Sequence, residues 1–132
     1  MRILFRGKAK FDGYGYKDGD WFFGNLIEEI RPDYTDYYIN PKTNGRKIAV
    51  YIETISQYTG LKDCNGNDVF EGDIIQDQDD ATLGMIYWDK EEAAFKIATS
   101  HEIISADDIV SYQVVGNIWD NKDLFKKIKD KD

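Results

Sequence analysis

The sequence is poor in the residues that hold metals and form disulfides. Cys64 is the only cysteine and His101 the only histidine among 132 residues. An intramolecular disulfide therefore has no second thiol, and a zinc site built from cysteine and histidine lacks ligands. We expect no metal or other cofactor, and a cytoplasmic location, because an isolated cysteine fits a reducing compartment.

Long apolar runs and phosphate-binding motifs are also missing. Charged residues interrupt the N-terminus after Ile3-Leu4-Phe5, which is too short for a signal-peptide core, and no run approaches the ~20 residues of a membrane span. We expect neither export nor membrane insertion. Gly13-x-Gly15 is followed by Asp18 where a dinucleotide fingerprint has glycine, and no Gly-Lys-Ser or Gly-Lys-Thr is present.

Catalytic motifs are equally scarce. His101 stands beside Ser100 without the turn and oxyanion hole that a catalytic triad requires, so a surface histidine is the better interpretation. The acidic neighbours of Cys64 disfavour the reactive thiolate. Two of the many carboxylates could converge in a hydrolytic site, but the sequence singles out no pair. We therefore predict no catalytic residue and a protein that is not an enzyme.

Positive charge is in short supply. The formal net charge is −8, and ten acidic residues but one basic residue, Lys90, lie between Asp63 and Glu92. Such a balance argues against direct nucleic-acid binding, which depends on clustered lysine and arginine. A solvated acidic face is the simplest interpretation. The alternative is a DNA-like acidic surface that occupies a host DNA-binding protein.

Aromatic residues are abundant, at 14% of the chain, and the apolar pattern favours strands. Residues 3–11 alternate with Phe5, Ala9 and Phe11 facing inward, and we expect them to form a hairpin with residues 21–28. Residues 31–47 contain both prolines, which predicts a surface excursion with at most one edge strand. The next apolar run places Ile48, Val50 and Ile52 on one face.

Residues 57–75 contain three glycine turns between apolar runs. We expect Thr59-Gly60 to end a strand and Asn65-Gly66 to form a type I′ hairpin turn, because both central positions of that turn need positive φ. Glu71-Gly72-Asp73 then leads into Ile74-Ile75. Asp63-x-Asn65-x-Asn67 has the opening spacing of a calcium loop, but Asp68 and Ile74 replace its essential glycine and glutamate, so we predict no calcium site.

In the second half of the chain, the sequence pattern predicts a hairpin, a helical turn, a strand and a helix, in that order. The hairpin joins residues 82–88 to 93–99, and its inward residues are expected to be Met85, Tyr87, Phe95 and Ile97. Ser105 is a candidate cap for one helical turn. A final strand spans 112–119, and Asn121 opens a helix with an apolar stripe of Leu124, Phe125 and Ile128.

One aromatic set could stack on single-stranded nucleic acid. Its members are Trp21, Phe22, Phe23, Tyr34, Tyr37 and Tyr38. Stacking platforms are flanked by basic residues, whereas these rings are flanked in sequence by Asp20, Glu28, Asp33 and Asp36. We therefore expect them in the core or in a protein interface, including self-association.

The central motif resembles that of the YopX family of phage and prophage proteins. The resemblance rests on residues 57–66, Gln-Tyr-Thr-Gly-Leu-Lys-Asp-x-Asn-Gly, and residues 69–75, Val-Phe-Glu-Gly-Asp-Ile-Ile. It extends to residues 3–8, 20–27, 53–55 and 115–121. It implies a small, mostly β, phage-encoded protein with a barrel-like or SH3-like later part, and it implies no reaction, cofactor or catalytic residue.

These observations predict a mainly β, small barrel-like antiparallel domain with a short C-terminal helix. The predicted single YopX-like domain covers 1–132, with an N-terminal hairpin region (1–56), a central motif and barrel-like part (57–121) and a helix (122–130). We expect a phage accessory protein that binds a host or phage protein, or itself, without catalysis. The alternative is the acidic decoy.

Overall fold

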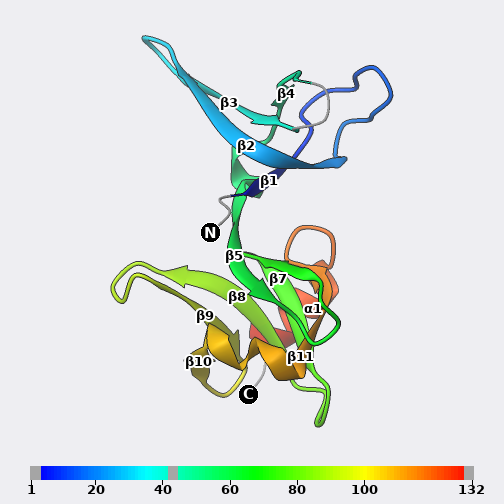
Figure 1. Cartoon of the computed structure of the whole chain (residues 1–132), viewed down its shortest axis with the longest axis vertical. Helices are drawn as coiled ribbons and strands as arrows, with labels where there is room; N and C mark the ends of the chain where they lie inside the picture. Colours follow the sequence, from blue (N-terminus) through cyan, green and yellow to red (C-terminus); the bar gives the residue numbers. More distant parts are fainter. Residues whose placement is uncertain (1–3, 42–44, 130–132) are drawn as a thin grey trace. The chain divides into compact units, whose positions relative to one another are not determined.

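The computed structural model describes residues 4–41 and 45–129, and these form a mainly β structure (Figure 1). Two antiparallel sheets and one short C-terminal helix make up its regular structure within those ranges, as the sequence predicts. No closed barrel is found among the described residues, so the barrel-like and SH3-like features stay predictions. The predicted strand start at Ile3 and helix end at residue 130 lie outside the described ranges.

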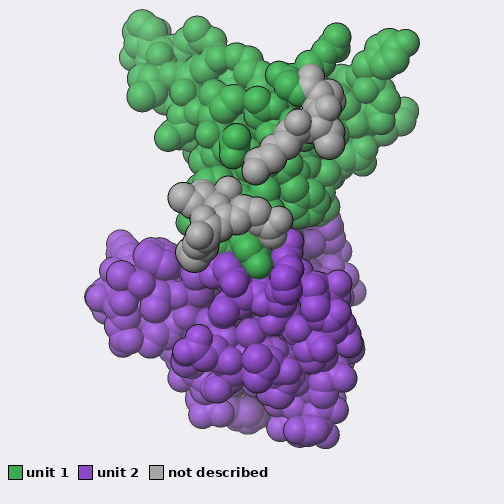
Figure 2. Space-filling view, viewed as in Figure 1, with its two compact units in different colours: residues 1–58 green, residues 59–132 purple. Residues whose placement is uncertain are grey.

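The chain divides into two compact units, residues 1–58 (unit 1) and residues 59–132 (unit 2), which Figure 2 colours separately. Strand β5 (Ser56–Lys62) begins in unit 1 and ends in unit 2. The single domain expected over 1–132 stays a prediction.

Unit 1 is built on antiparallel strands in the order β4-β3-β2-β1-β5. Before β5 its elements are β1 (Phe5–Lys8), β2 (Trp21–Ile30), β3 (Thr35–Asn40), β4 (Ile48–Ala49) and the 3₁₀ turn η1 (Ile52–Thr54). The predicted first hairpin is confirmed, with Phe5 opposite Gly24 and Lys8 opposite Trp21. Backbone hydrogen bonds also join Lys10 to Ala49 and Tyr51 to Lys8.

The prediction of at most one edge strand in residues 31–47 is wrong. Strand β3 lies between β2 and β4, so it is internal to the sheet. Its Ile39 stands opposite both Leu26 and Ile48 and is fully buried. The prolines flank this strand in sequence and leave its pairing intact.

Phe11, which was predicted to face inward, and Ile52, which was predicted to share a face with Ile48 and Val50, are both exposed. Ala9 is buried as expected and Ile48 and Val50 are buried together, whereas Phe11 is 62% and Ile52 57% exposed. The alternation fails because β1 ends at Lys8, with only a single bridge from Ala9 to Val50 beyond it, and because η1 begins at Ile52. A 3₁₀ turn does not keep the period of two that a strand imposes.

Unit 2 holds a five-stranded antiparallel sheet in the order β10-β9-β8-β7-β11. Its elements after β5 are β6 (Asp68–Phe70), β7 (Asp73–Asp77), β8 (Leu83–Asp89), β9 (Ala94–Thr99), β10 (Ile103–Ser105), the 3₁₀ helix η2 (Ala106–Ser111), β11 (Tyr112–Asn117) and α1 (Lys122–Lys129). The β8–β9 hairpin confirms the predicted pairing of residues 82–88 with 93–99.

The core of unit 2 corrects the predicted face of β8. A buried cluster contains Val69, Ile75, Ile86, Ile97, Ile109 and Tyr112. Ile97 is buried and Phe95 packs against the cluster, as expected, but Ile86 fills the core where Met85 and Tyr87 were predicted. Ile86 stands opposite Ile97, which places both side chains on one face and turns Met85 and Tyr87 to the other.

The central turns follow the prediction in part. Strand β5 continues through Thr59-Gly60, because the Thr59 hydroxyl accepts from the Leu61 N–H and donates to the Val69 carbonyl. Asn65-Gly66 does connect β5 to β6, but φ is positive only at Gly66 (+82°), so the turn is not type I′. Gly72 (φ +88°) leads into β7 with Ile74 and Ile75 fully buried, as predicted.

The C-terminal predictions are largely confirmed. The Ser105 hydroxyl accepts from the Asp107 N–H at 3.2 Å and opens η2. The last strand ends at Asn117, two residues before the predicted Trp119. Asn121 precedes α1, and its Oδ1 accepts from the Asn117 N–H at 3.0 Å. The helix buries Ile128 and keeps Leu124 and Phe125 half-buried.

Candidate functional site

Asp63 is the first residue of the segment that has only the opening spacing of a calcium loop. Its carboxylate is buried and surrounded by hydrogen-bond donors of the protein. Its Oδ1 accepts from the N–H groups of Asn65 and Asn67, each at 2.9 Å, and its Oδ2 accepts from the Val114 N–H at 2.9 Å. Burial alone would raise the pKa of Asp63, but the hydrogen bonds from Val114, Asn67 and Asn65 lower that pKa below its ordinary value. The carboxylate thus shapes the turn.

The same turn covers one edge of the unit 2 sheet. Strand β11 is an edge strand, and its Tyr112 carbonyl accepts from the Cys64 N–H while its Val114 N–H is bound by Asp63. Open edges invite pairing with another chain, and bonding their backbone groups removes that template. The motif residues 63–67 therefore close an edge, and Cys64 contributes its backbone there while its residue remains exposed.

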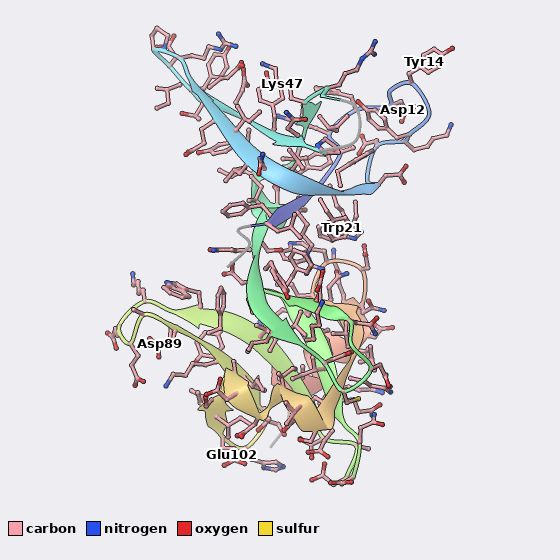
Figure 3. All side chains as sticks on the ribbon, in the orientation of Figure 1. Asp12, Tyr14, Trp21, Lys47, Asp89 and Glu102 are labelled. Carbon is pink, nitrogen blue, oxygen red and sulfur yellow. The ribbon has the colours of Figure 1, made fainter. Side chains whose placement is uncertain are left out.

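Several acidic residues of unit 2 stabilise turns. Asp89, labelled in Figure 3, accepts from the N–H groups of Glu91 and Glu92 between β8 and β9. Asp77 accepts from Asp79 and Asp80 in the same way between β7 and β8. Among the described residues, no group of three or more His, Cys, Asp or Glu side chains is placed to hold a metal ion. The absence of a metal or cofactor stays a prediction.

Two further residues tested for chemistry lie in turns and loops of their own units. His101 sits in the turn after β9, where its N–H donates to the Thr99 hydroxyl at 3.2 Å. Gly13 forms a two-way backbone bridge with Tyr16 in the loop between β1 and β2.

The aromatic set belongs to unit 1, and cations cover two of its rings. The Arg6 guanidinium carbon lies 4.7 Å and the Lys8 ammonium 5.4 Å from the ring centre of Trp21. The Lys47 ammonium lies 4.4 Å from the ring centre of Tyr38 and also pairs with Glu29. The sequence shows only acidic residues next to these rings, because Arg6 and Lys8 come from β1 and Lys47 from the residue before β4.

A groove of about 380 Å³ opens on unit 1. Its walls include Phe11 and Ile52, which are exposed, and its other members are Lys10, Thr35, Asp36, Tyr37, Tyr38, Ala49 and Val50. We call it the Phe11 groove. The sequence did not predict this groove, because Phe11 was expected to face inward and Ile52 to share a face with Ile48 and Val50, which are buried.

The β2–β3 hairpin extends the face on which the groove lies. β2 and β3 run on together as a two-stranded hairpin (Figure 1). Ile30 stands opposite Thr35, which lines the groove, and Ile30 is 82% exposed. Arg31 holds the tip, since it pairs with Glu29 at 2.9 Å and Asp36 at 3.3 Å. The hairpin therefore presents an ordered apolar end.

A second pocket of about 620 Å³ lies on the same unit. It is lined by Tyr14, Gly15, Tyr16, Phe22, Arg46, Lys47 and Ile48. Tyr14 is 99% exposed and reaches out from the loop between β1 and β2 (Figure 3). The Tyr51 hydroxyl donates to Asp18 at 2.8 Å and so connects this loop to the segment that precedes η1. The same hydrogen bond raises the pKa of Tyr51.

The geometry describes a mainly β protein with an apolar, grooved surface on unit 1 and an edge-closing motif on unit 2. The family model for YopX protein matches residues 5–126, so this chain belongs to the YopX family, as its central motif predicted. No curated protein is significantly similar to the chain. Within the described ranges, no helix has both the length and the apolar character needed to cross a bilayer.

Proposed function

We propose that this protein is a non-enzymatic binding module that contacts a protein partner through the Phe11 groove and the adjoining face of the β2–β3 hairpin. One observation carries the proposal. Three large apolar side chains, Phe11, Ile52 and Ile30, remain 62%, 57% and 82% exposed at or beside one groove. Each would be stabilised by leaving water.

Protein contact suits this surface better than a small ligand does. Scattered apolar side chains are normal on any surface, but apolar residues gathered around a groove are typical of interfaces. The groove also carries little charge. Apart from its two tyrosines, its ionisable side chains are one base, Lys10, and one acid, Asp36. A neutral, aromatic floor fits an apolar side chain from a polypeptide.

Selection of peptides from a random library tests this function. The wild-type chain is the target, and F11S/I52S is the counter-target, because it removes both exposed walls without touching a buried side chain. We expect selected peptides that bind the wild type at least tenfold more tightly than the double variant. V110S is the matched control, since Val110 is 73% exposed in unit 2. Peptides indifferent to F11S/I52S, or no selected peptide, would contradict the proposal.

The wider setting follows from the family resemblance. A phage-encoded accessory protein acting in the host cytoplasm fits a small module without a catalytic set. The barrel-like architecture proposed for residues 57–121 is supported by the backbone bond from the Cys64 N–H to the Tyr112 carbonyl, which links the turn between β5 and β6 to the edge strand β11. An amide-exchange map by NMR tests that architecture, because a closed ring of strands protects the Cys64 and Val114 amides as strongly as those of β7.

A second candidate function, the acidic decoy, is favoured by the charge of unit 2. Residues 59–132 contain 17 acidic and 8 basic residues, a net charge of −9. Its weakness is that Asp63, Asp77 and Asp89 already have local roles in turns. Salt-sensitive capture of a bacterial DNA-binding protein, with release by added duplex DNA, would support it. Capture that added duplex DNA does not reverse would contradict the decoy function.

A further inference from the structure

Two oppositely charged side chains beside the Phe11 groove lack partners among the described residues. Glu28 lies on β2, opposite Tyr37, and is exposed. Lys10 lines the groove, and only its backbone N–H is bonded, to Ala49. Glu29 and Asp36, on the same hairpin, are both paired with Arg31. Glu28 and Lys10 are therefore available to pair with groups on another molecule.

The hairpin and the groove complement each other. Glu28 and Ile30 are two residues apart on β2, so both project from the same face of the hairpin. The groove offers Lys10 together with the exposed apolar walls Phe11 and Ile52. The hairpin therefore supplies a carboxylate and an exposed apolar side chain, and the groove supplies an ammonium group and exposed apolar walls.

We propose that the groove's occupant is a second copy of this chain, in a two-fold dimer. Each copy lays its β2–β3 hairpin over the Phe11 groove of the other, so that Ile30 meets Phe11 and Ile52, and Glu28 meets Lys10. This rests on the proposed function, because it names the partner of the same surface. A two-fold axis makes every contact twice, which suits a surface carrying both halves of the match.

The local charge balance favours a second copy over a strongly charged partner. Unit 1 contains nine basic and eight acidic residues, a net charge of +1, so two copies of this surface repel each other little. A highly acidic or basic partner would leave Lys10 or Glu28 facing a like charge.

Charge reversal with mixing tests the dimer. Sedimentation velocity is measured over a concentration series for the wild type, E28K, K10E and an equimolar mixture of the two variants. We expect the wild type to dimerise reversibly, and each single variant to dimerise at least tenfold more weakly, because like charges then face each other at both contacts. The mixture should regain wild-type association, since the lysine introduced at position 28 meets the glutamate introduced at position 10.

The controls separate charge at this surface from charge in general. E102K makes the same change at an exposed residue of unit 2 and should leave association unchanged (Glu102 is labelled in Figure 3). All substituted positions are exposed, and circular dichroism checks that each variant folds. A mixture that stays monomeric while the wild type dimerises, or a dimer indifferent to both reversals, would overturn the inference.

The outcome also separates this inference from the proposed function. If the wild type is still monomeric at about 1 mM, the dimer inference is wrong. A dissociation constant of about 1 mM corresponds to only about 4 kcal/mol of binding free energy. If library peptides still require Phe11 and Ile52, the binding function stands with another partner. If those peptides are insensitive as well, both proposals fall together.

Discussion

Units 1 and 2 differ in how they distribute apolar side chains. Among the described residues, unit 1 has five buried apolar residues and six exposed large ones, whereas unit 2 has ten buried and three exposed. Burial of apolar surface is the main favourable contribution to folding. Unit 2 therefore buries most of its apolar residues in its own core, and unit 1 leaves more of its large apolar side chains exposed to solvent.

Charge separates the two units in the same direction. Unit 1 carries a net charge of +1 and unit 2 a net charge of −9. The acids of unit 2 fix turns through side-chain-to-backbone bonds, which stabilise hairpins locally. In the function proposed above, unit 2 is the stable, well-solvated scaffold and unit 1 presents the binding surface.

The largest expected effect comes from opening the unit 2 core. I97A should cost about 4 kcal/mol of unfolding free energy, because it leaves a cavity against Ile86 and the rest of the buried cluster. I39A in unit 1 also removes a fully buried side chain, but a thinner core relaxes more easily, so we expect about 2 kcal/mol. Urea denaturation measures both. Equal losses of unfolding free energy in I97A and I39A would show that the two cores do not differ in this way.

Gly72 offers the next largest effect. G72V should destabilise by about 3 kcal/mol, because valine is strained at φ +88° and a Cβ there would lie 2.5 Å from the Trp119 ring. G66A also places a side chain at positive φ, but nothing lies within 4 Å, so about 1 kcal/mol is expected. Thermal unfolding compares the two variants. A milder G72V than G66A would mean that Trp119 can move aside.

Removing the Asp63 carboxylate should cost about 2 kcal/mol. D63A leaves the Asn65, Asn67 and Val114 N–H groups without their acceptor. The control D89A removes acceptors from an exposed turn, where water replaces them, and should cost less.

The Asp63 effect should also depend on pH. Since folding lowers the pKa of Asp63, its contribution is present above its unfolded pKa, about 3.9, and is lost as pH falls through its folded pKa. Denaturation at pH 7 and at pH 2 to 4 should therefore show the difference between wild type and D63A shrinking in acid. A difference that stays constant would mean that Asp63 titrates normally.

Much of the fold was predictable because local patterns control it. The first hairpin, the β8–β9 hairpin, the Ser105 cap and the apolar stripe ending at Ile128 follow from alternation, capping chemistry and helical spacing. The central motif also predicted the family correctly.

The candidate surface was not predictable, because it depends on where alternation stops. Phe11 and Ile52 continue apolar patterns in the sequence, yet one follows the end of β1 and the other begins η1. The face of β8 was assigned wrongly for a related reason, since Ile86 and Met85 are both apolar and only pairing with Ile97 decides between them. Lys47 reaches Tyr38 across strands, which no sequence window reveals.

Surface ion pairs should give the smallest effects, and they extend the comparison to both units. K62A in unit 2 removes a 2.6 Å contact with Asp68, and R31A in unit 1 removes the contacts with Glu29 and Asp36. Both sites are partly exposed to solvent, so each change should lower the free energy of unfolding only slightly at low salt and by less still in about 1 M NaCl. Because Arg31 also orders the hairpin tip, R31A should weaken peptide binding or dimerisation more than K62A does. Equal effects on binding would place the binding surface away from the β2–β3 hairpin.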